Sequence, residues 1–238
     1  MPAAFTGFPE EMIRFFRGLK RNNRREWFQP RKHLFEQHVK APMLDLVAAI
    51  NADLAKFAPD YVTEPKSALF RIYRDTRFSA DKTPYKTHIA ASFSRRGSER
   101  LGTGGLYFSV SPENIEVAAG LWHPERDVTL SIRNHIAETH QELRRILADK
   151  KSRKLTGEMK GEALTRSPKG FDPAHPAAEW IKMKDWIFDV ALEPDMATSP
   201  QLHREVVARF RAMLPLVNYL NRPLLARKPS RDLLADAW

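Results

Sequence analysis

Residues 71–88, which read RIYRDTRFSADKTPYKTH, hold an unusually dense set of side chains that could bind or react. The segment contains three arginines at three-residue spacing, together with lysines, aspartates, tyrosines and a histidine. This mixture is typical of a site that holds an anion, or of a lattice of charges that hold one another. The candidate binding residues are Arg71, Tyr73, Arg74, Asp75, Arg77, Lys82, Tyr85, Lys86 and His88.

The first interpretation of this segment is an anion pocket. Arginine presents a planar fork of N–H donors that matches a carboxylate or a phosphate, and Lys82 and Lys86 add point charges. Tyr85 offers a hydroxyl or a ring face, while Asp75 and His88 could act as an acid–base pair. The sequence specifies no reaction, so we assign no catalytic residue.

The second interpretation is a structural lattice of ion pairs. In this interpretation Asp75 clamps a neighbouring arginine and Asp81 caps a turn before Lys82. Arg74 alternates onto the apolar face of the segment, where a buried guanidinium must be paired to avoid a large desolvation cost. The sequence leaves both interpretations open.

The position of these residues follows from the expected strands. Residues 68–78 and 86–95 alternate in polarity as strands do, so their side chains should point to opposite faces in turn. If the two apolar faces coincide, the charged residues of both strands converge on the other face, and Tyr107, Ser109 and Glu116 of the next two strands could join them.

Helical and extended patterns divide the chain into three parts. Helical patterns fill the region before residue 58, with Asn23 and Glu26 spaced as in a capping box and Pro42 expected to break a helix. Strand patterns follow, including a hairpin over 104–122, and 186–192 could add a fifth strand. The order predicts an α+β fold with one domain over 1–238. Its antiparallel sheet has about four to five strands in the central segment 66–122, packed with N- and C-terminal helices, and 222–238 form a basic tail that frays.

Composition narrows the classes of protein. The 238 residues carry 39 lysines and arginines against 29 acidic residues, a net charge of +10, which makes nucleic acid an alternative partner. The chain has no cysteine, which excludes disulfides and thiolate chemistry. It lacks a signal-peptide pattern, an apolar run of the roughly 20 residues that span a bilayer, a local metal-binding motif and a phosphate-loop lysine. We therefore expect a cytoplasmic protein with no membrane partner, no metal and no cofactor.

Several motifs together resemble one known family. The segment RIYRDTRF (71–78) followed by DKTPYK (81–86) is similar to the signature of the bacterial and fungal family called domain of unknown function 2461. Further similar segments are NNRREWF (22–28), GGLY (104–107), GLWHP (120–124), and PKGF (168–171) before His175-Pro176. The resemblance covers nearly the whole chain and implies a single-domain member. It implies no activity, because the family's name records none.

These observations lead to one main hypothesis. The sheet carries a basic pocket for a small anionic ligand that bears a phosphate or a carboxylate. A nucleic-acid-binding protein and a scaffold in which the arginine motif is purely structural are the alternatives. The oligomeric state is not specified by the sequence.

Overall fold

Four antiparallel strands form one sheet at the centre of the molecule. The computed structural model describes residues 5–77, 79–97 and 102–225. Within these residues the strands follow one another in chain order across the sheet, as β1-β2-β3-β4. Their bounds are β1 Ile89–Phe93, β2 Gly105–Val110, β3 Ile115–Leu121 and β4 Trp186–Leu192. Helices precede and follow the first three strands, so the predicted α+β class is confirmed.

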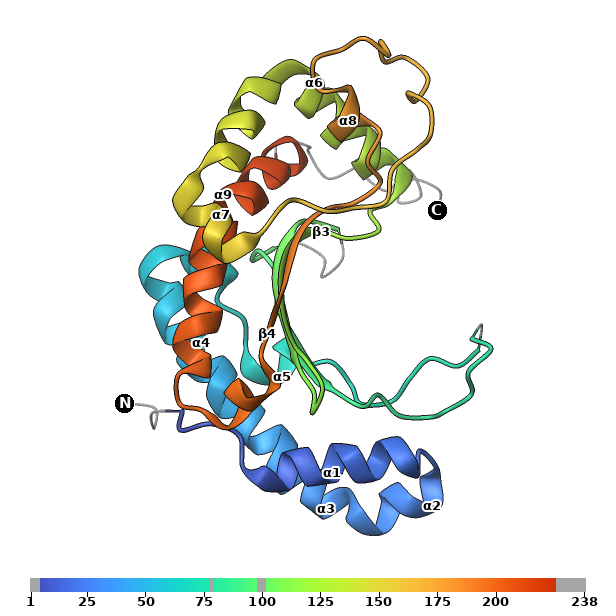
Figure 1. Ribbon diagram of the computed structural model, residues 1–238, viewed down its shortest axis with the longest axis vertical. Helices are drawn as coiled ribbons and strands as arrows, with labels where there is room; N and C mark the ends of the chain where they lie inside the picture. The colour runs from blue at the N-terminus through green and yellow to red at the C-terminus, as the bar shows by residue number, and fades with distance from the viewer. Residues whose placement is uncertain (1–4, 78, 98–101, 226–238) are drawn as a thin grey trace, which may run out of the picture.

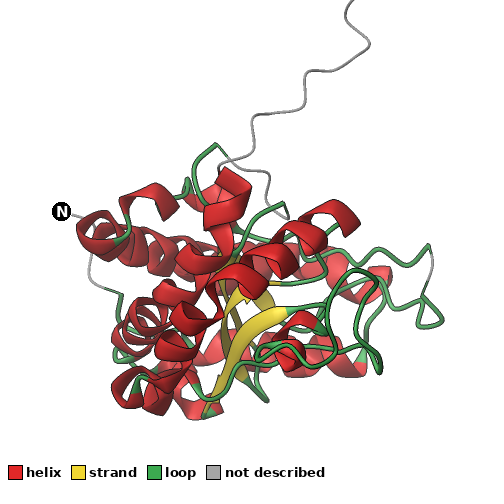
Figure 2. Ribbon diagram, turned by 90° about the horizontal axis from the view of Figure 1, so that it is seen from above, coloured by secondary structure: helices red, strands yellow, loops and turns green. Residues whose placement is uncertain are grey.

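Helices flank the sheet, and Figure 2 shows their arrangement from above. The first group is α1 Glu10–Arg21, α2 Arg25–Phe28, α3 Lys32–Phe35, a π-helix at Glu36–Lys40, α4 Ala41–Phe57 and α5 Pro65–Ala68. The second group is α6 Arg126–Ala148, α7 Lys150–Thr156, α8 Ala178–Ile181 and α9 Leu202–Leu225. Short 3-10 helices lie at Gln29–Arg31, Pro59–Tyr61 and Pro194–Thr198. Pro42 falls in the first turn of α4, where its missing N–H costs nothing. The predicted interruption of the helix lies just before Pro42, where the chain forms the π-helix.

One face of the sheet packs on helices and forms the core. Figure 1 shows the sheet nearly edge-on, with α4, α7 and α9 on one side of it. Side chains along β3 alternate between buried and partly exposed, as expected for a sheet with one covered face. On the covered face Phe93 and Phe108 meet Phe210 of α9, with the Phe93 and Phe210 rings 5.6 Å apart and perpendicular. Burial of each such ring stabilises the fold by roughly 1.5–3 kcal/mol.

The other face of the sheet carries polar side chains interspersed with small residues. The register places Ser92, Tyr107 and Ala118 side by side across three strands, and Asp189 of β4 pairs with Ala118. The neighbouring row contains Ser109 and Glu116. His88 precedes β1 by one residue, and by alternation it belongs to the same face as Ser92.

Residues 68–77, the described part of 68–78, do not form the expected strand. This segment runs beside residues 84–91 and makes only scattered backbone bonds, from Phe70 N to Ala90 O (2.9 Å), Lys86 N to Ile72 O (2.8 Å) and Arg74 N to Pro84 O (2.9 Å). A continuous ladder fails because Pro84 has no N–H to donate. Aspartate side chains also bond nearby backbone N–H groups and bend the chain. We call the described residues of 69–88 the arm; Figure 1 shows it extending away from the sheet. The sheet therefore has four strands, the fourth being 186–192.

One local expectation is wrong, and another falls mostly outside the described residues. Asn23 does not cap α2, which begins after Arg24 without a side-chain cap; its amide bonds the arm instead. At the other end, α9 continues through Pro215 and Pro223 to Leu225, so the chain is still helical over 222–225. Residues 226–238 of the predicted basic tail lie outside the described part of the chain.

Both outer edges of the sheet meet a short irregular segment. On the β4 side, Lys160 exchanges two backbone bonds with Ile187, at 2.7 and 3.0 Å. On the β1 side, Leu69 and Phe70 of the arm lie against Ala90 and Ala91. Buried apolar residues from both the helices and the strands form one core cluster. The organisation of the chain as a single domain stays a prediction. None of the described helices has the length and apolar character needed to cross a bilayer.

Candidate functional site

The base of the arm is fixed by contacts around Tyr85. Asn23 donates its amide N–H to the backbone oxygen of Tyr85 at 2.8 Å and accepts the backbone N–H of Tyr85 at 3.0 Å. The Tyr85 ring stacks on Phe28 of α2, with centroids 4.2 Å apart, and lies 5.4 Å from the ring of Tyr73. These contacts tie the arm to the helices that precede it in sequence.

A second set of bonds fixes Arg74 of the arm. Its Nη1 donates to the Asp81 carboxylate and to the Thr83 hydroxyl. Asp81 also accepts the backbone N–H of Thr83 at 2.9 Å. The bonds from Thr83 and Arg74 lower the pKa of Asp81 to about 2, so this carboxylate stays ionised at neutral pH. Arg74 keeps N–H donors at Nε and Nη2 beyond these bonds.

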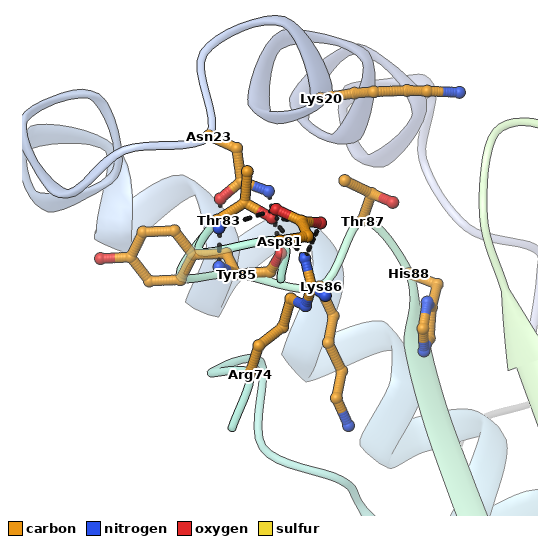
Figure 3. A pocket seen from close by; sticks show the side chains of 9 residues that line it. All are labelled: Lys20, Asn23, Arg74, Asp81, Thr83, Tyr85, Lys86, Thr87 and His88. Atoms are coloured by element: carbon orange, nitrogen blue, oxygen red, sulfur yellow. Dashed lines mark hydrogen bonds and ion pairs between the residues drawn. The ribbon is translucent and has the colours of Figure 1, made fainter. Parts of the chain in front are cut away.

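These residues border a hollow of about 390 Å³. We call it the basic hollow; its lining residues are Lys20, Asn23, Arg74, Asp81, Thr83, Tyr85, Lys86, Thr87 and His88. In Figure 3, Lys20 extends from α1 on one side, while Lys86 and His88 point away from the Asn23–Thr83–Asp81 group on the other. Three of the lining side chains are cationic and one is a carboxylate, so the lining has an excess of positive charge.

The surroundings of His88 in the basic hollow shift its pKa. Burial lowers the pKa of His88, and the nearby charge of Lys86 lowers it further. Both causes favour the neutral imidazole at pH 7. The Lys86 ammonium lies over the ring of Phe70, 5.1 Å from its centroid, and Phe70 in turn meets Tyr107 of the sheet edge-on at 5.9 Å. The basic hollow thus adjoins the polar face of the sheet.

The nine sequence-predicted residues divide into three groups. Arg74, Tyr85, Lys86 and His88 border the basic hollow together. Arg71 and Tyr73 border a separate hollow.

The remaining three lie along the outer arm, outside both hollows. Lys82 donates to the backbone oxygen of Thr76 at 2.9 Å. Asp75 and Arg77 pair with each other at 2.8 Å, and the Arg77 side chain is 77% exposed. Their bonds lower the pKa of Asp75. Asp75 thus pairs with a neighbouring arginine, and Asp81 accepts the backbone N–H two residues ahead, which are contacts of the kind that the lattice interpretation describes.

Some residues of the site carried no recognisable signal. Lys20 looks like any exposed lysine of an amphipathic helix, and Thr83 and Thr87 have no motif of their own. Asn23 stood in a segment that resembles the family, but its spacing to Glu26 indicated a helix cap. Nothing in the sequence relates residue 20 to residue 88 in space.

The polar face of the sheet gathers the residues that were expected to join the site. Tyr107, Ser109 and Glu116 lie there, with Asp189, which sequence reasoning missed. Ser109 Oγ lies 3.4 Å from Glu116 Oε2, and Lys160 Nζ lies 3.5 Å from Asp189 Oδ2. Burial raises the pKa of Glu116, and the Asp189 charge raises it further. Burial likewise raises the pKa of Tyr107.

His123 in the turn after β3 has a structural explanation. Its φ of +45° lies in the left-handed region that non-glycine residues rarely adopt. Asp185, which is fully buried, accepts the His123 backbone N–H at 2.7 Å and holds this conformation. Within the described ranges 5–77, 79–97 and 102–225, no group of three or more histidine, aspartate or glutamate side chains could hold a metal ion.

The fold and these contacts define an α+β protein with an antiparallel sheet and a basic hollow where an arm meets α1. The chain belongs to the family described as "Conserved hypothetical protein (DUF2461)", whose model matches residues 11–219. No curated protein and no solved structure gave a match.

Proposed function

We propose that the protein binds a small anionic ligand, bearing a phosphate or a carboxylate, in the basic hollow. The observation that carries the proposal is that three cationic residues, Lys20, Arg74 and Lys86, border a hollow with a single lining carboxylate, Asp81. The hollow lies within the size range of small-molecule sites. An anion there would meet charged donors from two parts of the chain, which are stronger than neutral ones.

Preorganisation supports the same function. Asp81 and Thr83 hold the Arg74 guanidinium in place, and Asn23 holds the backbone next to Lys86. A ligand therefore does not have to order these groups on binding, which lowers the entropic cost of association. Asp81 neutralises Arg74 only in part, since the guanidinium keeps donors for a second acceptor.

Titration calorimetry with inorganic phosphate, a phosphate monoester and a dicarboxylate tests the proposal. Lys86→Ala and Lys20→Ala should each weaken the best of these ligands by about tenfold, the cost of one charged hydrogen bond. Lys20 pairs with Glu113 at 3.1 Å, so its matched control is Lys56→Ala, which removes an exposed lysine paired with Asp53 at 2.8 Å. The control should bind like the wild type. Absence of binding by all three anions, or unchanged affinity in both hollow variants, would refute the proposal.

Nucleic acid remains the second candidate because of the net charge of +10. It predicts affinity for a single-stranded oligonucleotide that falls steeply with salt, since bound counterions are released. A concave site of small volume supports the small ligand instead. An oligonucleotide that binds tightly in low salt, while small anions do not bind, would favour this candidate.

A further inference from the structure

A second hollow, of about 360 Å³, lies against another part of the arm. It shares no lining residue with the basic hollow. Residues from α2, α3, the π-helix, α5 and the arm all border it. The proposal made for the basic hollow does not involve it, although Arg71 and Tyr73 of the arginine segment are placed here.

Aromatic rings dominate the apolar part of this second hollow. Phe28, Phe35, Phe70 and Tyr73 border it. Phe28 and Phe35 are buried, with their centroids 5.8 Å apart, whereas Tyr73 is 45% exposed although it lies 6.4 Å from Phe28. Tyr73 thus contacts Phe28 edge-on and still exposes part of its ring, so it can add an aromatic contact to a ring bound in this hollow.

Cations border the same hollow in excess. Lys32, Lys40, Lys66 and Arg71 contribute four positive charges, and Glu36 contributes the one negative charge. Glu36 is already paired with Lys40 at 2.7 Å. In the described part of the chain, Lys32, Lys66 and Arg71 form no ion pair within 4 Å. Hydrogen bonds lower the pKa of Glu64 and of Asp75, and the charges of Lys66 and Arg71 lower these pKa values further, yet neither cation is held in a direct pair.

The helix that supplies part of this border is irregular at the hollow. Glu36–Lys40 form a π-helix, and both end residues border the hollow. π turns are rare, occur mostly as single turns inside α-helices, and are frequently found at functional sites. This irregularity is a second observation that points to the hollow, independent of its charge.

We propose that the second hollow binds an aromatic anion: a one- or two-ring aromatic group with a carboxylate, phosphate or sulfonate attached. The ring would lie against Phe28 and Phe35 beneath Tyr73, and Arg71 and Lys66 would contact the acidic group. The charged residues of the border would meet the acidic group, whereas the aromatic and aliphatic side chains that would meet the ring carry one hydrogen-bonding group, the Tyr73 hydroxyl. The site therefore suits an unadorned ring better than a nucleobase, whose edge requires several polar partners.

Calorimetry with naphthalene-2-sulfonate tests this inference, with 2-naphthalenemethanol and sulfate as the neutral and ring-free probes. With saturating inorganic phosphate present to occupy the basic hollow, the sulfonate should bind at least about tenfold more tightly than either, because each lacks one of the two contacts. Arg71→Ala should reduce the preference for the sulfonate over the alcohol by about tenfold, and Tyr73→Ala should weaken both ring-bearing probes. Arg14→Ala, which removes an exposed arginine paired with Glu11, is the matched control and should change nothing.

Competition separates this inference from the proposed function. Saturating inorganic phosphate should leave the affinity for naphthalene-2-sulfonate unchanged, since the two hollows share no residue. If phosphate does not bind at all, the proposed function fails while the aromatic-anion site stands. Equal affinity for the alcohol and the sulfonate, unchanged binding in both Arg71→Ala and Tyr73→Ala, or displacement of the sulfonate by phosphate would overturn the inference.

Discussion

The side chain of Asn23 pairs with both backbone polar groups of Tyr85, as a neighbouring strand would. An asparagine amide can do this because it carries a donor and an acceptor side by side. Two other asparagines make the same pairing. Asn51 bonds the N–H and C=O of Thr63 at 3.1 and 2.6 Å, and Asn221 bonds those of Gly104 at 2.7 and 2.9 Å. Asparagine side chains thus fix backbone segments that lie outside the regular hydrogen-bond ladders of the sheet.

The Asn23 pairing supports the basic hollow, and its removal should affect both stability and binding. Asn23→Ala leaves both Tyr85 groups without their partner, so we expect unfolding free energy to fall by about 1–2 kcal/mol. Anion affinity should fall as well, because Tyr85 precedes Lys86. Urea unfolding and calorimetry measure the two effects. Asn22→Ala is the control: Asn22 bonds only Gly18 of its own helix, and its loss should leave anion affinity intact.

Asn221 has the same pairing in a fully buried position, so its loss should cost more. Asn221→Ala would leave the N–H and C=O of Gly104 without their partner and would remove the hydrogen bond to the Tyr61 hydroxyl. We expect a loss of about 3 kcal/mol or more in urea unfolding. Exposed Asn218, which accepts from the same hydroxyl at 3.2 Å, provides the comparison. A similar loss in Asn218→Ala would show that burial is not the cause.

His88 should make anion binding depend on pH. Burial and Lys86 hold its pKa below the ordinary value of 6.5. A bound anion favours the charged imidazole and raises this pKa, so binding takes up a proton and tightens as pH falls. Calorimetry with sulfate between pH 7.5 and 5.5 should show this trend, because sulfate does not titrate there. His88→Gln should flatten it, whereas His33→Gln on an exposed helix face should not.

Arg77 tests whether the basic hollow or the arginine pattern of the sequence identifies the residues that bind the anion. The pattern gave Arg77 the same standing as Arg74, yet Arg77 lies outside both hollows. Arg77→Ala should change anion affinity by less than about twofold and stability by less than about 1 kcal/mol, as for other exposed ion pairs. Arg74→Ala should weaken anion binding clearly. If the two variants lose affinity equally, the basic hollow is not where the anion binds.

Glu116 on the polar sheet face should oppose folding at neutral pH. Burial and Asp189 raise its pKa above the ordinary 4.5. The unfolded chain therefore releases this proton more readily, so stability present below pH 4.5 is lost as pH rises through the folded pKa. Glu116→Gln should raise the melting temperature by a few degrees at pH 7.5 and by little at pH 4.5. Glu113→Gln, which removes the partner of Lys20, should give no such gain.

Short-range patterns predicted the sheet well where each strand is regular. The hairpin of β2 and β3 was recognisable because alternating residues flank the turn at 111–114, and 186–192 was expected as a further strand. Residues 68–78 alternate equally well, but alternation describes any extended segment. Pro84 decides against a ladder there from the opposite part of the arm, and the aspartates do so by accepting backbone N–H groups two residues ahead.

The site was harder to predict because its parts come from distant segments. The arginine segment indicated where charge gathers, yet its own aspartates pair with two of the three arginines. The cations that border the basic hollow include Lys20, which reaches it from α1 through the chain's fold. Asn23 shows the same limit: one side chain can cap a helix or pair with a backbone group 62 residues away, and local spacing does not distinguish the two.

The short segments at both margins of the sheet have a consequence for behaviour at high concentration. Leu69 and Phe70 on one side, and Lys160 on the other, already occupy backbone groups that an incoming chain would need for intermolecular strand pairing. Self-association by sheet extension is therefore blocked at each margin without a closed barrel, and substitutions that detach either segment should promote fibrous aggregates.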